Sequence, residues 1–195
     1  MFLTDYMPTL ETRRLLIRRL TMRDANDIFD YSRDPQVARH VLWEAHRSIG
    51  ESKAYLRFML RKYRLMDAAS WGIELKREHK IVGTIGYMWI QTENACAEVG
   101  YSLARACWNQ GIMTEALQEV LRYSFEDLHL NRVEAMHEVD NPASGAVMRK
   151  CGMRLEGTQR QKLYNKGRYV DVDIYAILKK DYASRRSGPA LRTDK

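Results

Sequence analysis

A turn between a strand pattern and a helix pattern, within residues 98–117, carries the clearest chemical signal in this chain. The strand pattern ends near Leu103, and the helix pattern begins between Gly111 and Thr114. The first amides of a helix lack internal partners, and the helix dipole makes that end positive. Gly111 would let the backbone come close to a ligand, so the turn suits a phosphate or pyrophosphate. A single glycine before a helix is also common punctuation, and the turn alone does not decide between the two interpretations.

The turn lacks the patterns of the common nucleotide-binding loops. It carries neither a Gly-x-Gly-x-x-Gly run nor a P-loop lysine, which disfavours a dinucleotide or a nucleoside triphosphate. The cysteines Cys96, Cys107 and Cys151 are scattered without Cys-x-x-Cys spacing. This argues against a disulfide framework and a zinc site, and it is typical of a reducing compartment. We therefore expect a cytoplasmic protein that needs no metal.

A second segment, residues 139–153, has Asn141-Pro142 and Ser144 at the start of a short helix pattern. Taken with the first segment, it resembles the GNAT superfamily of acetyltransferases. The run W-N-Q-G-I-M-T-E-A looks like the acetyl-CoA pyrophosphate loop, and N-P-A-S-G-A-V-M-R-K-C-G-M looks like the element after the next strand of the family. The opening L-E-T-R-R-L-L-I-R-R-L and the closing Y-N-K-G-R-Y-V-D-V-D-I-Y-A-I-L are similar to the subgroup that holds the ribosomal-protein N-alpha-acetyltransferases.

The resemblance covers residues 10–182 and implies an α/β (α+β) fold with a single GNAT-like domain over residues 1–183. Its mixed, mostly antiparallel central sheet would be flanked by helices. The sheet would be splayed between the strands around Val99–Leu103 and Val133–Val139, with the pantetheine arm of acetyl-CoA in the gap. Residues 184–195 would form a basic, disordered tail.

By the same resemblance, the acetyl-CoA site is formed mainly by the backbone. Groups of the gap strand would pair with the pantetheine arm like an added strand, amides of the turn would hold the pyrophosphate, and two polar residues would lie beside the pantetheine and the thioester. In that order, the residues are Val99, Tyr101 and Leu103; Asn109, Gln110, Gly111, Ile112 and Met113; Asn141 and Ser144.

Three positions depart from the family pattern. Trp108 stands where the loop usually begins with Gln or Arg, and Met113 stands at its second small position. Both residues keep their backbone amides, so the phosphate site is retained. Many relatives carry a tyrosine general acid in the short helix, and Met148 stands at that position here. A tyrosine acid at position 148 is therefore excluded.

Direct acetyl transfer needs a neutral amine, a polarised thioester carbonyl and a proton for the departing thiolate. A peptide α-amino group has a pKa of about 8, against about 10.4 for lysine, so a weak base acting through water would suffice. Glu98 is our first candidate for that base, and Glu138 on the neighbouring strand is the second. Glu98 could equally be a solvated strand carboxylate or an arginine partner.

The candidate hydrogen-bond or proton donor to the coenzyme A sulfur is Ser144, which could also cap the short helix. Tyr164 is an alternative acid. Cys107 and Cys151 could support a covalent acetyl-cysteine route, which we disfavour because no base is paired with either in the sequence.

Acceptor recognition would fall to the variable parts, namely His40–Ser48, Tyr87 with Trp89, and the turn near Tyr164. We expect the acceptor to be a protein N-terminus, such as that of a ribosomal protein. The alternatives are an enzyme for a small amine (a polyamine, amino sugar or antibiotic) and a non-catalytic acetyl-CoA-binding module. A homodimer is left open.

Hydropathy patterns predict the elements that must position these residues. A helix pattern over residues 24–41 should break at Asp34-Pro35, because the residue before proline avoids the helical region. Ser48 and Glu51 have the spacing of a capping box before the next helix. The other predictions are strands near residues 15–20, 70–76, 80–90, 97–103 and 132–139, helices near 114–128 and 143–151 with Gly152 closing the latter, and a hairpin turning at 165–167.

The formal net charge of +7 does not indicate a nucleic-acid-binding protein. Residues 179–195 contain six basic and two acidic residues, so much of the charge lies in the tail. No nucleic-acid-binding module accompanies it, and we expect no direct nucleic-acid binding. The chain has no apolar run near the ~18 residues that span a bilayer, so we expect no membrane partner.

Overall fold

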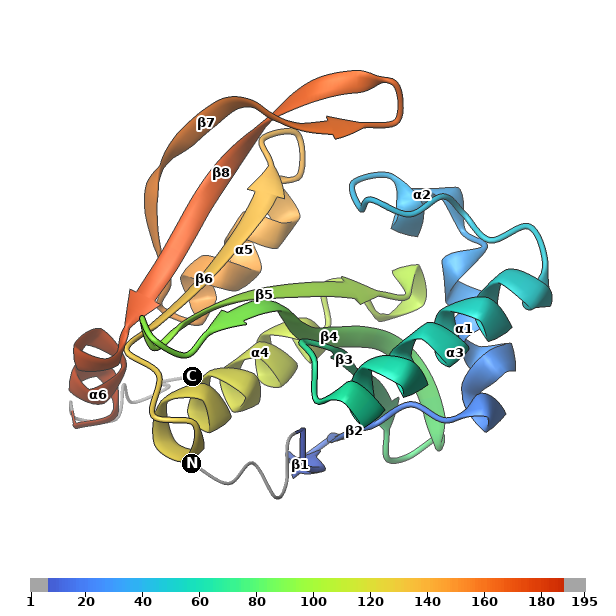
Figure 1. Ribbon diagram of the computed structural model, residues 1–195, viewed down its shortest axis with the longest axis horizontal. Coiled ribbons are helices and arrows are strands. Elements are labelled where there is room, and N and C mark those ends of the chain that lie inside the picture. The colour runs from blue at the N-terminus through green and yellow to red at the C-terminus, as the bar shows by residue number, and fades with distance from the viewer. Residues whose placement is uncertain (1–6, 188–195) are drawn as a thin grey trace, which may run out of the picture.

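The computed structural model describes residues 7–187, whose elements are shown in Figure 1. The strands are β1 (Leu10–Glu11), β2 (Leu15–Arg18), β3 (Ser70–Leu75), β4 (Lys80–Gln91), β5 (Cys96–Leu103), β6 (Arg132–Glu138), β7 (Arg154–Asn165) and β8 (Arg168–Leu178). The α-helices are α1 (Ala25–Ser32), α2 (Pro35–Ala38), α3 (Ile49–Leu65), α4 (Ile112–Arg122), α5 (Pro142–Lys150) and α6 (Lys179–Ser187). Two short 3-10 turns, η1 (Met22–Asp24) and η2 (Arg105–Cys107), and a π-helical turn, η3 (Tyr123–Asp127), complete the described elements. None of the helices between residues 7 and 187 is long and apolar enough to cross a membrane.

The strands form one sheet in the order β1-β2-β3-β4-β5-β6-β8-β7. Every neighbouring pair is antiparallel except β5 with β6, which run parallel. In Figure 1, β6, β8 and β7 diverge from the plane of β4 and β5. The prediction of a single domain with a mixed, mostly antiparallel sheet flanked by helices is confirmed.

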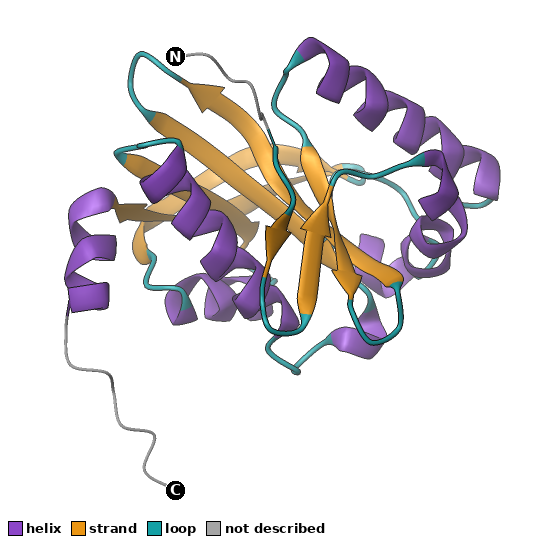
Figure 2. Cartoon of the chain, turned by 90° about the horizontal axis from the view of Figure 1, so that it is seen from below, coloured by secondary structure: helices purple, strands orange, loops and turns teal. Residues whose placement is uncertain are grey.

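Helices cover both faces of the central strands (Figure 2). On β4, Thr84 interacts with Tyr31 of α1, whereas Tyr87 bonds to Ser124 of η3, which directly follows α4. Since side chains alternate along a strand, positions three residues apart lie on opposite faces. The face that carries Thr84 is therefore covered by α1 with α3, and the opposite face by α4 with α5.

The predicted break at Asp34-Pro35 is confirmed. Helix α1 ends at Ser32 and α2 begins at Pro35, the first helical position, where a proline costs no hydrogen bond. The Asp34 side chain accepts a hydrogen bond from the Gln36 amide at 2.9 Å and caps the second helix.

The predicted capping box at the start of α3 is wrong, although the helix itself is confirmed. Ser48 is the N-cap residue, but its side chain accepts no capping hydrogen bond. Glu51 reaches one residue further back and accepts from the Arg47 amide at 2.9 Å. The sequence spacing indicated where the helix begins but not which amide the carboxylate would reach.

The last hairpin turns at Lys166-Gly167, whose φ angles are +49° and +81°. Positive φ at both central residues is typical of the two-residue turns that match strand twist. After β8, helix α6 runs to Ser187, so the expected boundary at residues 183/184 falls inside a helix. The rest of the predicted tail, residues 188–195, lies outside the described residues.

Candidate active site

The two parallel strands separate part-way along their length. Strands β5 and β6 pair only from Cys96–Glu98 with Arg132–Glu134. Beyond this point β6 continues to Glu138 paired with β8, while β5 continues to Leu103 paired with β4. The predicted splay is therefore present. On β5 the gap begins at Val99, as expected. On β6 it begins two residues later than expected, at Ala135, because Val133 and Glu134 still pair with β5.

Backbone groups of β5 line this gap. Ala104 donates to Val82 of β4 at 2.7 Å, so the even-numbered residues of β5 bond toward β4. Backbone groups alternate in direction along a strand, and the odd-numbered residues therefore face the gap. Val99, Tyr101 and Leu103 are these residues, as the resemblance implied. Their peptide groups can accept an extended amide-containing ligand as an added strand.

The side chain of Trp108 forms a hydrogen bond with one of these backbone groups. Its indole Nε1 donates to the Leu103 carbonyl oxygen at 2.8 Å, and its side chain is 41% exposed. The indole thus fixes the start of the turn against the end of β5. This bond uses one of the two lone pairs of the Leu103 carbonyl oxygen, so we expect the N–H of Leu103 to be its main group for a ligand.

We expect Trp108→Phe to weaken acetyl-CoA binding about threefold to tenfold, because one neutral hydrogen bond between turn and strand is lost. The acceptor KM should stay unchanged. Isothermal titration with coenzyme A and steady-state kinetics measure the two effects. Unaltered coenzyme A affinity would show that the indole bond does not organise the site.

The turn after β5 presents amides at the start of α4. Gly111 is the N-cap residue with φ +71°, and Asn109 has φ +59°. Two residues of the turn thus have a left-handed backbone conformation. The side chains of Ile112 and Met113 are only 3% and 5% exposed, packed in the core. Only the backbone of these two residues can face a ligand. The geometry fits a pyrophosphate held by amides at a helix N-terminus.

Arg14, which the sequence did not single out, holds this turn. Its guanidinium donates to the Gln110 carbonyl at 2.9 Å and to Glu115 at 2.6 Å. Thr12 also donates to Glu115, at 2.6 Å. Burial alone would raise the pKa of the Glu115 carboxyl, but these hydrogen bonds and the Arg14 charge outweigh it and hold the pKa below its usual value.

Replacing Arg14 with Met is expected to raise the acetyl-CoA KM about fivefold, since loss of a charged hydrogen bond loosens the loop, with kcat nearly kept. The melting temperature of the wild-type protein should fall as the pH drops below the usual pKa of a glutamate carboxyl. The pKa of Glu115 is lowered in the folded state, so its protonation removes stability. This fall should be shallower in the variant. An equal acid dependence in both proteins would contradict the pairing.

Ser144 lies in the first turn of α5, beside β5. Asn141 caps this helix, with its side-chain oxygen 3.4 Å from the Ser144 amide. The Ser144 hydroxyl donates to the Tyr101 hydroxyl at 3.0 Å. The structure thus brings Asn141, Ser144 and Tyr101 together, although sequence reasoning gave Tyr101 a backbone role only.

Glu98 is the last residue of β5 that pairs with β6. Trp89 of β4 donates to its carboxylate at 2.9 Å. Burial raises the pKa of Glu98, and the nearby Glu134 charge adds to the rise, while the Trp89 bond and Lys162 oppose it. A carboxylate with a raised pKa is a better proton acceptor than an ordinary one.

Glu138, the competing candidate, has its oxygens occupied. It accepts from Asn165 at 2.5 Å and from His40 at 2.9 Å, and Arg168 lies 3.5 Å away. Burial would raise the pKa of this carboxyl, but the bonds from His40 and Asn165, with the His40 and Arg168 charges, lower it. A buried carboxylate so fully paired joins β6 to the last hairpin and the α2–α3 loop.

The residues expected to contact the acceptor differ in whether they are buried or exposed. Tyr87 is wrong as an acceptor residue, because it is fully buried and its hydroxyl bonds to Ser124 at 2.6 Å. Tyr164 is 63% exposed at the end of β7, in a T-shaped contact with Tyr169. Lys166 donates to the carbonyls of Val41 and Trp43, which joins the hairpin tip to the loop at residues 40–48.

Buried thiols weigh against a covalent route. Cys107 and Cys151 are buried, and burial raises the pKa of both, to about 12 for Cys151. A thiol held protonated is a poor nucleophile. Between residues 7 and 187 there is also no group of three or more His, Cys, Asp or Glu side chains that could hold a metal.

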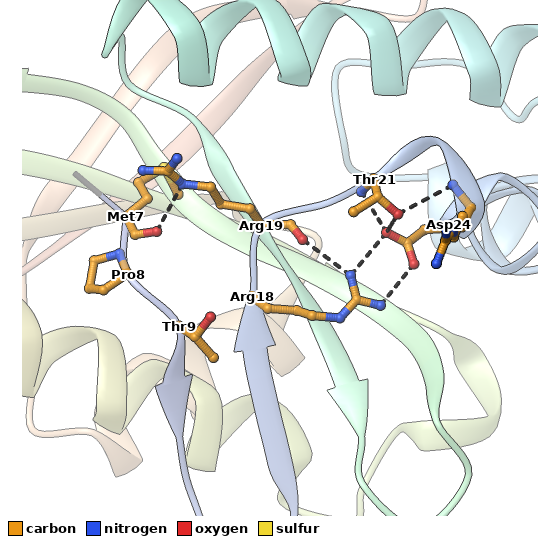
Figure 3. A pocket seen from close by; sticks show the side chains of 8 residues that line it. Met7, Pro8, Thr9, Arg18, Arg19, Thr21 and Asp24 are labelled. Carbon is orange, nitrogen blue, oxygen red and sulfur yellow. Dashed lines mark hydrogen bonds and ion pairs between the residues drawn. The ribbon is translucent and has the colours of Figure 1, made fainter. Parts of the chain in front are cut away.

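A cavity of about 590 Å³ lies elsewhere, beside β2 and η1 (Figure 3). Arg18 projects into it but already pairs with Asp24 at 2.8 Å and Glu74 at 2.6 Å. Its guanidinium is therefore already engaged in two ion pairs within the fold. The cavity contains none of the residues described above for the gap.

Comparison with known proteins identifies the chemistry of this arrangement. The family model described as Acetyltransferase (GNAT) domain matches residues 14–154. The chain belongs to the GNAT family of acetyltransferases. It is an acetyl-CoA-dependent N-acetyltransferase.

Relatives align with nearly the whole length of this GNAT chain. It is 33% identical to an uncharacterised N-acetyltransferase p20 of Bacillus licheniformis, over 91% of this chain and 99% of the relative. It is 28% identical to the [ribosomal protein uS5]-alanine N-acetyltransferase of Escherichia coli, over 91% and 94%.

Solved structures agree. A GNAT acetyltransferase of Bacillus anthracis has a TM-score of 0.79 at 25% identity, covering 88% of this chain and 99% of the other. The ribosomal-protein-S5-alanine acetyltransferase of Vibrio fischeri has a TM-score of 0.73 at 26% identity, covering 89% and 98%.

Proposed function

We propose that this GNAT enzyme transfers the acetyl group of acetyl-CoA to the N-terminal α-amino group of a protein, such as a ribosomal protein. The observation that supports the transfer site is the gap after Glu98, with a strand edge on one side and a helix N-terminus at its end. The relative named for ribosomal protein uS5, which matches over nearly its full length, supports the acceptor class. The need for acetyl-CoA and a ribosomal acceptor supports a cytoplasmic location.

Acetyl-CoA fits the gap by the chemistry of its parts. The pyrophosphate would lie against the amides of residues 109–113, where the helix dipole favours an anion. The amides of the pantetheine arm would pair with Val99, Tyr101 and the Leu103 N–H. This directs the thioester toward the closed end of the gap, between Glu98 on β5 and Ser144 on α5.

Each candidate then has one role. Glu98, acting through water, takes the proton of the acceptor ammonium. The neutral amine attacks the thioester carbonyl carbon, the C–N bond forms, the C–S bond breaks and the electron pair leaves on sulfur. Ser144 donates a hydrogen bond to that thiolate. The nitrogen loses a second proton as it becomes the amide, and this proton neutralises the thiolate, while Glu98 returns the first proton to solvent.

An acceptor panel tests this proposal. Thiol release from acetyl-CoA is measured with N-terminal peptides, with the same peptides bearing a blocked N-terminus and one internal lysine, and with polyamines and aminoglycosides. Intact-mass analysis locates the product. Acetylation of free N-termini beginning with small residues is expected. Turnover confined to small amines, or equal turnover on internal lysine, would overturn the assigned acceptor.

A further inference from the structure

One partly buried phenol beside the gap has no role in the chemistry described above. Tyr101 extends from β5 toward the first turn of α5, and its hydroxyl is linked to Ser144 twice. It donates to the Ser144 carbonyl at 3.1 Å and accepts from the Ser144 hydroxyl at 3.0 Å. One side chain thus holds both the backbone and the hydroxyl of the serine proposed to face the sulfur.

This phenol is neutral and fixed. Burial raises the pKa of Tyr101 well above the usual tyrosine value, and the Ser144 bond opposes the rise only in part. Its proton is directed to a carbonyl, so the phenol offers Ser144 an uncharged acceptor. The helix position 148 carries a buried methionine, so no phenol reaches the serine from α5 itself.

We propose that Tyr101 is a positioning residue for Ser144, which rests on the proposed role of Ser144 at the sulfur. In the ground state the thioester sulfur is a weak acceptor, and the serine hydroxyl donates to the phenol. As the C–S bond breaks, the thiolate becomes the stronger acceptor and the hydroxyl rotates to it. The phenol keeps its bond to the Ser144 carbonyl, so the turn does not move. The interaction with sulfur then strengthens only toward the transition state.

A double-mutant cycle tests this coupling. Ser144→Ala is expected to lower kcat about 10- to 100-fold, the effect of one hydrogen bond to a charged group. Tyr101→Phe should lower kcat about threefold to tenfold through misplacement of that bond, with the acetyl-CoA KM changed less than twofold. If Tyr101 acts through Ser144, the double variant is no slower than Ser144→Ala alone.

The fold provides a matched control. Tyr87 and Ser124 form a second tyrosine–serine pair, which is buried, at 2.6 Å, away from the gap. Tyr87→Phe also removes a tyrosine hydroxyl and should leave kcat unchanged. If both Phe variants lose a similar amount of thermal stability, a fall in kcat that occurs only in Tyr101→Phe is not caused by the loss of stability. Ser144→Thr retains a hydroxyl and should restore part of the activity of Ser144→Ala only when Tyr101 is present.

The outcomes separate the two proposals. The role of Tyr101 would be overturned if the losses in kcat of the two single variants multiply in the double variant. It would also be overturned if Ser144→Thr restores activity in a protein that carries Tyr101→Phe. Full activity of Ser144→Ala would instead remove Ser144 from the transfer step, and the proposal for Tyr101 would fall with it. Acceptor identity, measured with the panel above, is unaffected by either result.

Discussion

Replacing Glu98 with Gln is expected to lower kcat/KM for a peptide acceptor about 100-fold at pH 7, the lower range for loss of a general base. Gln can still accept the Trp89 indole N–H, so the strand pairing and the acetyl-CoA affinity should stay unchanged. Steady-state kinetics with coenzyme A titration checks both. Glu119→Gln, which alters a carboxylate paired with Arg122 on α4, is the control.

The pH profile separates a base from a structural carboxylate. In the wild-type enzyme, kcat/KM should fall on the acid side as Glu98 is protonated. Burial raises the pKa of Glu98, so this fall occurs at higher pH than for an ordinary carboxyl. The Gln variant should lose this inflection and keep the one of the amine. A loss of this inflection in Glu138→Gln, with Glu98→Gln fully active, would reverse the assignment.

The second large effect is expected at the pyrophosphate turn. Gly111 has φ +71°, a conformation that β-branched residues avoid. Gly111→Val should therefore rearrange the turn and raise the Kd of acetyl-CoA about 5- to 30-fold, from about 1–2 kcal/mol of backbone strain. Equilibrium titration with coenzyme A measures it.

Gly167 supplies the control for strain. It has φ +81° in the β7–β8 turn, with nothing within 4 Å of an added Cβ. Gly167→Val imposes similar strain away from the phosphate turn and should leave the coenzyme A Kd unchanged. Equal affinity losses in the two variants would show that general destabilisation, rather than the turn, is responsible.

Local signals in the sequence predicted the elements that position the site. The proline after Asp34, the Lys166-Gly167 turn and Gly152, with φ +89° after α5, each act on neighbouring residues only. The splay followed from the family resemblance, because nothing within β5 alone indicates that its partner diverges after Glu98.

Side-chain partners distant in the sequence could not be predicted. Arg14 and Glu115 are separated by 101 positions, and His40 and Glu138 by 98. No periodicity links such residues, because their contact depends on how the layers pack. Tyr87 was misplaced for the same reason, since its strand pattern does not show which face α4 covers.

Hydrogen exchange tests most directly that acetyl-CoA lies in the gap between β5 and β6. Exchange of the backbone amides is measured with and without coenzyme A. We predict slower exchange at residues 99, 101 and 103 and at residues 109–113, with β7 unchanged. Protection confined to the cavity at residues 18–24, with the amides of β5 and the turn unaffected, would contradict the account.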